Sequence, residues 1–232
     1  MEGIRNVDWI KVRESLDAHG FAQVKNVLSR ETCEEIVKLY SDEKLFRSTI
    51  NMQRYRFGLG EYRYFTYPLP SVIQGLRQDV YQPLVSIAND WMKSLSIEIT
   101  YPNNLEKFLA LCHSKNQQRP TPLILRYEIN GFNTLHQDIY GEVYFPFQVV
   151  FMLTEAGKDF EGGELVFVEQ LPRAQSRAEV VNPAQGDAVI FTTNFRPVKG
   201  IKGYYRAKMK HGVSRIKKGM RYTMGIIFHD AA

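Results

Sequence analysis

The sequence predicts a mainly β protein with supporting helices, built as a sandwich, jelly roll or barrel. After residue 118 the chain consists of short apolar runs rich in Val, Ile, Phe, Tyr and Thr, separated by turn signals such as "NGFN" and "PAQGD". Many short strands without helices between them are typical of these architectures. We expect a single domain over residues 1–232, with largely helical support and a possible lid in residues 1–118 and a jelly-roll core in residues 119–232.

The first half is expected to contain a short strand and three helices. The strand covers residues 20–28, and the helices cover residues 29–40, 71–95 and 104–114. Ser29 can cap the first helix, whose apolar face follows the i, i+3, i+4, i+7 pattern through Cys33, Ile36, Val37 and Tyr40. The second helix contains Pro83, which is expected to kink it.

The second half is expected to contain strands throughout. They are predicted at residues 123–129, 145–154, 163–170, 178–183, 187–193 and 222–230. In addition, residues 210–215 and 220–228 are predicted to pair as a hairpin around the turn "IKKG". This succession of strands and turns completes the β core.

Composition excludes several classes of protein. Two cysteines, Cys33 and Cys112, are too few for a disulfide framework. The amino terminus has no continuous apolar segment of the signal-peptide kind, and no apolar run approaches the ~20 residues that span a bilayer. The sequence therefore predicts a soluble cytoplasmic protein with no membrane partner.

The net charge of +5 hides an asymmetry along the chain. Residues 188–228 contain ten Lys or Arg residues and no Asp or Glu. A one-sided basic block of this kind often contacts an anion, although a solvated basic surface is an equally good interpretation.

A possible metal site begins with His136 and Asp138 in "LHQD". An H-x-D pair arises by chance in roughly one of five such sequences, so it needs a third ligand. On a strand, residues i and i+2 point to the same face, so both side chains could address one ion. Among the other histidines, His211 is the best third ligand, because it precedes a predicted turn in the β half.

Two histidines and one carboxylate form the facial triad of non-haem Fe(II) oxygenases, which leaves positions open for other molecules. A structural zinc site would usually have a fourth ligand, often cysteine, although a hydrolytic zinc site remains possible. Arg221 follows His211 by ten residues, and the predicted hairpin would bring it to the same site. Its guanidinium could bind the distal carboxylate of a dicarboxylic acid in a two-pronged pair.

These residues carry a family resemblance. "LHQD" with "HGVSRIKKGMR" resembles the H-x-D…H…R signature of Fe(II)/2-oxoglutarate-dependent dioxygenases. "DFEGGELVFVE" and "VVNPAQGDAVIF" resemble the prolyl-hydroxylase-like branch, and "RYEINGFNTLHQD" resembles a segment of AlkB-type nucleic-acid demethylases. Over nearly its whole length, the chain resembles bacterial 2-oxoglutarate oxygenases commonly described as acting on damaged, alkylated DNA.

The resemblance implies a double-stranded β-helix in which His136, Asp138 and His211 hold Fe(II) and Arg221 binds the C5 carboxylate of 2-oxoglutarate. Decarboxylation of 2-oxoglutarate by O₂ would be coupled to hydroxylation or oxidative demethylation of a substrate. Tyr127 could donate its hydroxyl to the cosubstrate, or it could be an ordinary core tyrosine.

The substrate stays open at this level. AlkB-type enzymes carry a second arginine shortly after the cosubstrate arginine and an asparagine before the tyrosine, where this chain has "YTMGIIF" and Leu125. Alkylated nucleic acid, a protein side chain of the prolyl kind and a small metabolite are the alternatives. A non-catalytic nucleic-acid-binding jelly roll is an alternative of another class.

Two segments bear on recognition. Residues 52–67 interleave arginines with aromatic residues and could be a mobile lid that stacks a base or a hairpin packed on the sandwich. The basic stretch of residues 192–210 precedes His211 and could line the entrance.

Overall fold

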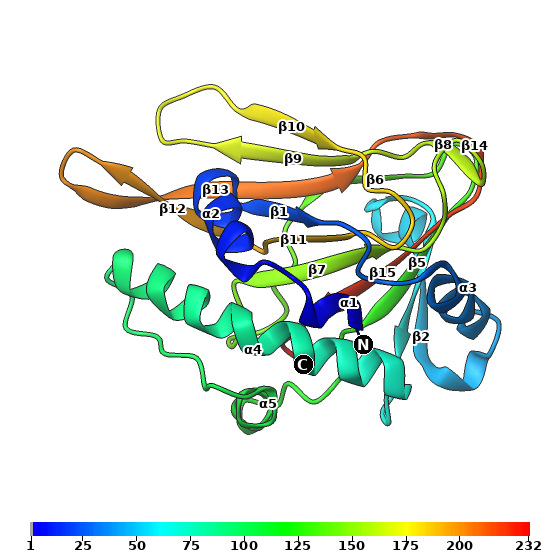
Figure 1. The fold of residues 1–232 in the computed structure, drawn as a ribbon, viewed down its shortest axis with the longest axis horizontal. Coiled ribbons are helices and arrows are strands. Elements are labelled where there is room, and N and C mark those ends of the chain that lie inside the picture. The colour runs from blue at the N-terminus through cyan, green and yellow to red at the C-terminus, as the bar shows by residue number, and fades with distance from the viewer. Residues whose placement is uncertain (1) are drawn as a thin grey trace.

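The computed structural model describes residues 2–232 and confirms the mainly β class. Two large antiparallel sheets face each other, and α4 and α5 lie below the larger sheet in the view of Figure 1. The helices are α1 (Glu2–Arg5), α2 (Trp9–His19), α3 (Arg30–Leu39), α4 (Ser71–Ser94) and α5 (Leu105–Ser114), with short 3-10 turns η1 (Glu43–Leu45) and η2 (Met52–Tyr55). This is the jelly-roll arrangement that the sequence predicts.

The larger sheet has seven strands. In spatial order they are β1 (Phe21–Val24), β11 (Ala188–Thr192), β7 (Phe147–Met152), β15 (Arg221–Ile227), β5 (Leu123–Tyr127), β4 (Glu61–Phe65) and β2 (Phe46–Asn51). Strands from the first and second halves of the chain therefore share one sheet.

The smaller sheet follows the order β10 (Arg177–Val181), β9 (Leu165–Gln170), β13 (Gly203–Val213), β6 (Phe132–His136) and β3 (Gly58–Leu59), and β12 (Phe195–Gly200) pairs with β13. A separate pair joins β14 (Ile216–Gly219) to β8 (Phe160–Gly162).

The larger of the hydrophobic clusters lies between the helices and the seven-stranded sheet. The apolar stripe of α4 is fully buried there, and the ring of Trp91 lies 4.6 Å from that of Phe147. Ser29 caps α3 as predicted, because its hydroxyl accepts a hydrogen bond from the backbone N–H of Thr32 at 3.2 Å. The helix α4 continues through Pro83. The helices therefore cover one face of the seven-stranded sheet, and the opposite face is available to line a site.

A second cluster fills part of the space between the sheets, and it contains Tyr127, Leu165, Phe167, Phe191 and Met209. A cavity of about 200 Å³ adjoins this cluster. No helix among residues 2–232 has the length and apolar character needed to cross a membrane.

Two expectations were wrong. The first half contains the predicted helices, but it also has four strands where one was expected: β1, β2 and β4 extend the larger sheet and β3 extends the smaller one. The hairpin of residues 210–228 does not form either. β13 and β15 belong to different sheets, and the stretch predicted as a turn is the strand β14, which pairs with β8. The turn signal is local, and the longer-range pairing with β8 overrides it.

Candidate metal centre

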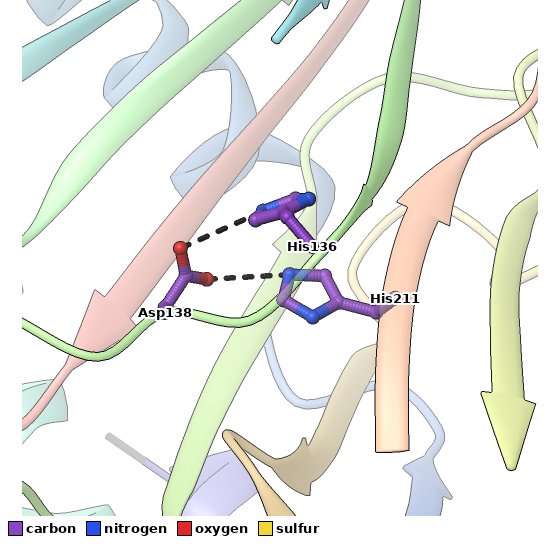
Figure 2. A group of neighbouring side chains, drawn as sticks. All are labelled: His136, Asp138 and His211. Atoms are coloured by element: carbon purple, nitrogen blue, oxygen red, sulfur yellow. Dashed lines mark ion pairs between the residues drawn. The ribbon is translucent and has the colours of Figure 1, made fainter. Parts of the chain in front are cut away.

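The three predicted metal ligands come together between the sheets. His136 is the last residue of β6, and the register of the smaller sheet places it directly opposite His211 of β13. Asp138 lies two residues beyond His136, in the loop after the strand rather than on the strand as expected. Figure 2 shows the carboxylate facing both imidazoles, and one potential ligand atom of each residue lies within 4.8 Å of the others. The spacing suits a single small ion.

Hydrogen bonds orient the two imidazoles and the carboxylate so that they could bind a cation. The Nδ1 of His136 lies 2.8 Å from the carbonyl oxygen of Thr134, to which it can donate, leaving the lone pair of Nε2 directed toward Asp138 at 3.5 Å. The Nε2 of His211 lies 3.2 Å from the other carboxylate oxygen. Burial alone would raise the pKa of Asp138, but the hydrogen bond with His211 and the neighbouring charges hold that pKa well below its usual range. The carboxylate is therefore available as an anionic ligand.

The loop after β6 is held by a buried amide. Tyr140 donates its hydroxyl to Asp138 at 2.6 Å, which orients the carboxylate. The side-chain N–H of Gln117 donates to the carbonyl oxygens of Tyr140, Val143 and Asp230, and its oxygen accepts from the backbone of Val143. Gly141 has a φ of +112°, and a Cβ there would lie 2.4 Å from the Cδ of Gln117. Only glycine fits this close approach.

The cavity that contains the triad is lined by both sheets. Its walls include Leu125, Val150, Leu165, Phe191, Val213 and Ile227, with Tyr62, Tyr64 and Phe57 contributing aromatic surface. Arg221 and Tyr127 also line it, as the sequence predicts for residues that would bind a cosubstrate.

The guanidinium of Arg221 lies in this cavity without a partner. Arg221 is fully buried, and none of its three side-chain nitrogens forms a hydrogen bond with any residue in the described part of the chain. Burial lowers its pKa to about 10, so the group stays protonated at neutral pH. A buried, unpaired charge is costly in a protein interior, so its presence indicates that an anion belongs beside it.

Tyr127 stands directly opposite Arg221 in the β5–β15 register. Its ring centroid is 5.7 Å from the guanidinium carbon, and its buried hydroxyl also finds no partner among residues 2–232. A cationic fork beside an unpaired hydroxyl is chemically matched to a carboxylate. The donor set therefore fits a carboxylate bound in the same cavity as the triad.

Sequence reasoning missed Gln148. This residue lies in β7, is buried, lines the cavity, and brings its amide nitrogen to 3.4 Å from the Nε2 of His211. If the Nε2 of His211 bound a metal, the side-chain amide of Gln148 would be free to donate to an oxygen atom of a molecule bound in the cavity. The available signal was a single polar residue inside the apolar run "FPFQVVFML".

The remaining histidines do not belong to the cluster. His19 is exposed on α2, and His113 lies 2.9 Å from Asp230. His229 accepts a hydrogen bond from the backbone N–H of Phe145 at 3.2 Å, and burial lowers its pKa to about 3, so it is a neutral structural residue. Choosing His211 as the third member of the cluster agrees with this geometry.

The aromatic segment of residues 52–67 divides into two parts. Tyr62 and Tyr64 belong to β4 and line the cavity wall. Tyr55 and Phe57 precede that strand, stack with ring centroids 5.6 Å apart, and remain 56% and 46% exposed. Because Phe57 also lines the cavity, this exposed pair stands at its mouth.

The basic stretch of residues 192–210 does not line the cavity, contrary to expectation. On β13 the exposed Lys208 and Lys210 alternate with the buried Met209 and His211. Since alternate strand residues point to opposite faces, the lysines face away from the cavity into which His211 points.

Comparison with known proteins identifies the family. Residues 60–231 match a family described as "Oxygenase, catalysing oxidative methylation of damaged DNA". The chain belongs to this oxygenase family. An uncharacterized protein of Mycobacterium tuberculosis is 46% identical over 168 residues, which are 72% of this chain and 72% of that protein.

Solved structures agree with this oxygenase assignment at the level of the fold. A Pseudomonas putida prolyl-4-hydroxylase superposes with a TM-score of 0.59 at 13% identity, covering 97% of this chain and 99% of its own. A Burkholderia pseudomallei oxidoreductase of the 2OG-Fe(II) oxygenase family gives 0.59 at 15% identity, covering 98% and 94%. The oxygenase shares their jelly-roll fold.

Proposed function

We propose that His136, Asp138 and His211 hold Fe(II), that Arg221 and Tyr127 bind the C5 carboxylate of 2-oxoglutarate, and that the oxidised substrate is an alkylated base in a nucleic acid. The observation that carries the cosubstrate assignment is the fully buried, unpartnered guanidinium of Arg221 in the same cavity as the triad. We further propose that residues 1–232 act as one catalytic domain in the cytoplasm, where the buried thiols of Cys33 and Cys112 stay reduced.

Bound Fe(II) supplies the oxidising chemistry, using O₂ and the electrons released as 2-oxoglutarate loses CO₂ to become succinate. The protein's own residues orient the reactants. Arg221 makes a two-pronged contact with one end of the cosubstrate, and the Tyr127 hydroxyl adds a third donor. The apolar walls exclude water, which strengthens these contacts and protects the reaction from side paths.

The aromatic residues at the mouth of the cavity favour a planar aromatic substrate. The stacked and exposed rings of Tyr55 and Phe57 offer a platform for a base, and Tyr62 and Tyr64 continue the aromatic surface inward. The family description, which names damaged DNA, points the same way. Oxidation of an N-methyl group would insert one oxygen atom into a C–H bond, and the hydroxymethyl product would release formaldehyde to restore the base.

Succinate formation tests the proposal. The protein with Fe(II) and 2-oxoglutarate should form succinate slowly alone, and several-fold faster with a methylated oligonucleotide. The unmethylated oligonucleotide and a proline-rich peptide are the controls. Stimulation by the peptide and not by the methylated oligonucleotide would replace the substrate with a protein side chain. No succinate under any condition would remove the catalytic assignment of these residues.

A further inference from the structure

The part of β13 distant from the cavity forms a projecting hairpin with β12. The pairing runs from Phe195 opposite Lys208 to Gly200 opposite Gly203 at the tip. Figure 1 shows this hairpin extending beyond the body of the protein, past one end of α4. We call residues 195–208 the basic arm.

One face of the basic arm is cationic. Directly opposed residues in an antiparallel pair share a face, so Lys199 lies beside Tyr204, and Arg206 and Lys208 follow along the same face. All four are exposed, as is Lys202 at the tip. Within residues 2–232, none of these cationic side chains forms an ion pair.

The other face of the arm is neutralised internally. Arg196 is buried there and donates to Glu169 at 2.6 Å and to the backbone carbonyl of Asp17. The arm is thus anchored through one face, while four positive charges on the other face and at the tip stay in solvent without counter-charges. Such a row of like charges repels itself and is matched to an extended anion.

The length of β13 sets the distance along the strand between this row and the reaction site, and the row lies on the face of the strand opposite to that of His211. Lys208 precedes His211 by three residues and Gly203 precedes it by eight, which at about 3.3 Å per residue correspond to roughly 10 and 26 Å. At about 3.4 Å per nucleotide of a duplex strand, the same distances equal roughly three to eight nucleotides. A two-stranded ribbon also has the width that a major groove admits.

We propose that the basic arm is a docking surface for the phosphodiester backbone of a nucleic acid, roughly three to eight nucleotides from the base that enters the cavity. The inference rests on the proposed nucleic-acid substrate and adds a second contact outside the cavity. It separates recognition into a base held at the aromatic mouth and a flank held by the arm, with the rigid strand β13 fixing their spacing.

The test compares two triple variants on oligonucleotides of different length. The arm variant carries Lys199→Ala, Lys202→Ala and Lys208→Ala. The matched control carries Lys25→Ala, Lys38→Ala and Lys44→Ala, which remove the same charge from exposed positions elsewhere. Duplexes with one methylated base and flanks of two, six or twelve base pairs are titrated by fluorescence anisotropy at several salt concentrations, and succinate formation is followed in parallel. Poly-glutamate serves as an anionic competitor.

For the wild-type protein and the control variant, the affinity for the duplex should rise about tenfold as the flank grows from two to twelve base pairs. The arm variant should lose this gain, and its slope of log K against log salt should be smaller by about one for each lysine that contacts a phosphate. Succinate formation without an oligonucleotide should be the same in all three proteins.

Equal behaviour of the two triple variants would overturn the inference, as would an absence of length dependence in the unchanged protein. Displacement of the duplex by poly-glutamate at equal charge concentration would overturn it too, since the surface would then bind acidic polypeptides as well. If the methylated duplex binds in the arm-dependent way but never stimulates succinate formation, the proposed function fails while the docking surface stands.

Discussion

The two ends of the cavity are built in opposite ways. At the inner end, Arg221 and Tyr127 are completely buried, stand opposite each other on neighbouring strands, and offer unpaired donors. At the mouth, Tyr55 and Phe57 are about half exposed and precede β4, which belongs to the seven-stranded sheet. The inner end is fixed by the sheet and would suit one small anion, whereas the mouth is an exposed aromatic surface. Under the proposed function, the contrast separates residues that bind the cosubstrate from residues that select the substrate.

The triad, in the same cavity, should show the largest effect. His211→Ala removes one of three ligands, so Fe(II) binding and succinate formation should both be lost. Isothermal titration with Fe(II) under anaerobic conditions measures the first, and succinate analysis the second. The exposed His19→Ala variant is the control and should be unchanged. Full turnover in His211→Ala would mean that another residue completes the site.

Arg221→Ala tests the inner end. A two-pronged, charge-assisted contact to a carboxylate contributes about 1.5–3 kcal/mol, so the KM for 2-oxoglutarate should rise roughly ten- to a hundred-fold. Fe(II) affinity should hardly change, because Arg221 does not belong to the triad.

The matched control for this variant is Arg215→Ala. Arg215 is exposed, with its guanidinium carbon 5.8 Å from the ring centroid of Phe132. Equal effects of the two arginine variants on the KM would refute the role given to the buried guanidinium.

Tyr140→Phe sharpens the boundary between the metal centre and its support. The ring remains, but Asp138 loses the hydrogen bond that orients it, so Fe(II) affinity should fall about tenfold. The absorption band of the Fe(II)–2-oxoglutarate complex should shift as well, which a purely structural role would not produce. Tyr144→Phe, in the same loop, is the control. An unchanged Fe(II) affinity in Tyr140→Phe would show that the carboxylate needs no such orientation.

Phe57→Ala tests the mouth and should have the smallest effect. Because the ring is half exposed, its stacking on a base should contribute about 1 kcal/mol, or roughly a fivefold change in affinity for a methylated single strand. The KM for 2-oxoglutarate should not move. Ile10→Ala, an exposed apolar residue on α2, provides the comparison for oligonucleotide binding. A cosubstrate effect as large as that of Arg221→Ala would erase the distinction between the two ends.

The residues of the site could be predicted from the sequence better than the way the strands connect them. His136, Asp138, His211 and Arg221 could be selected because few residue types perform this chemistry, and the structure brings the first three together and places Arg221 in the same cavity. The predicted path of the chain from His211 to Arg221 was wrong, however. A hairpin would have carried Arg221 back to His211, whereas β14 passes the chain from the smaller sheet to the larger one.

Other parts could not be derived from local patterns. The segment containing Tyr62 and Tyr64 alternates as a strand does, but nothing local shows that it pairs with β5 at the wall of the cavity. Tyr140 is one polar aromatic residue in a loop, and its role depends on Gln117, 23 residues earlier in the chain. Long-range hydrogen bonds of this kind leave no periodic signal.

The contact between Gly141 and Gln117 limits how this oxygenase can diversify. The glycine fits against the amide with no room for a side chain, and the amide also holds the carbonyl of Asp230. A side chain at position 141 would therefore disturb the loop that carries Tyr140, whose hydroxyl donates to Asp138. New substrate preferences would therefore arise more readily at the exposed residues Tyr55 and Phe57 than in this loop. Mutagenesis libraries for altered specificity should randomise residues 53–57 and keep residues 137–143 constant.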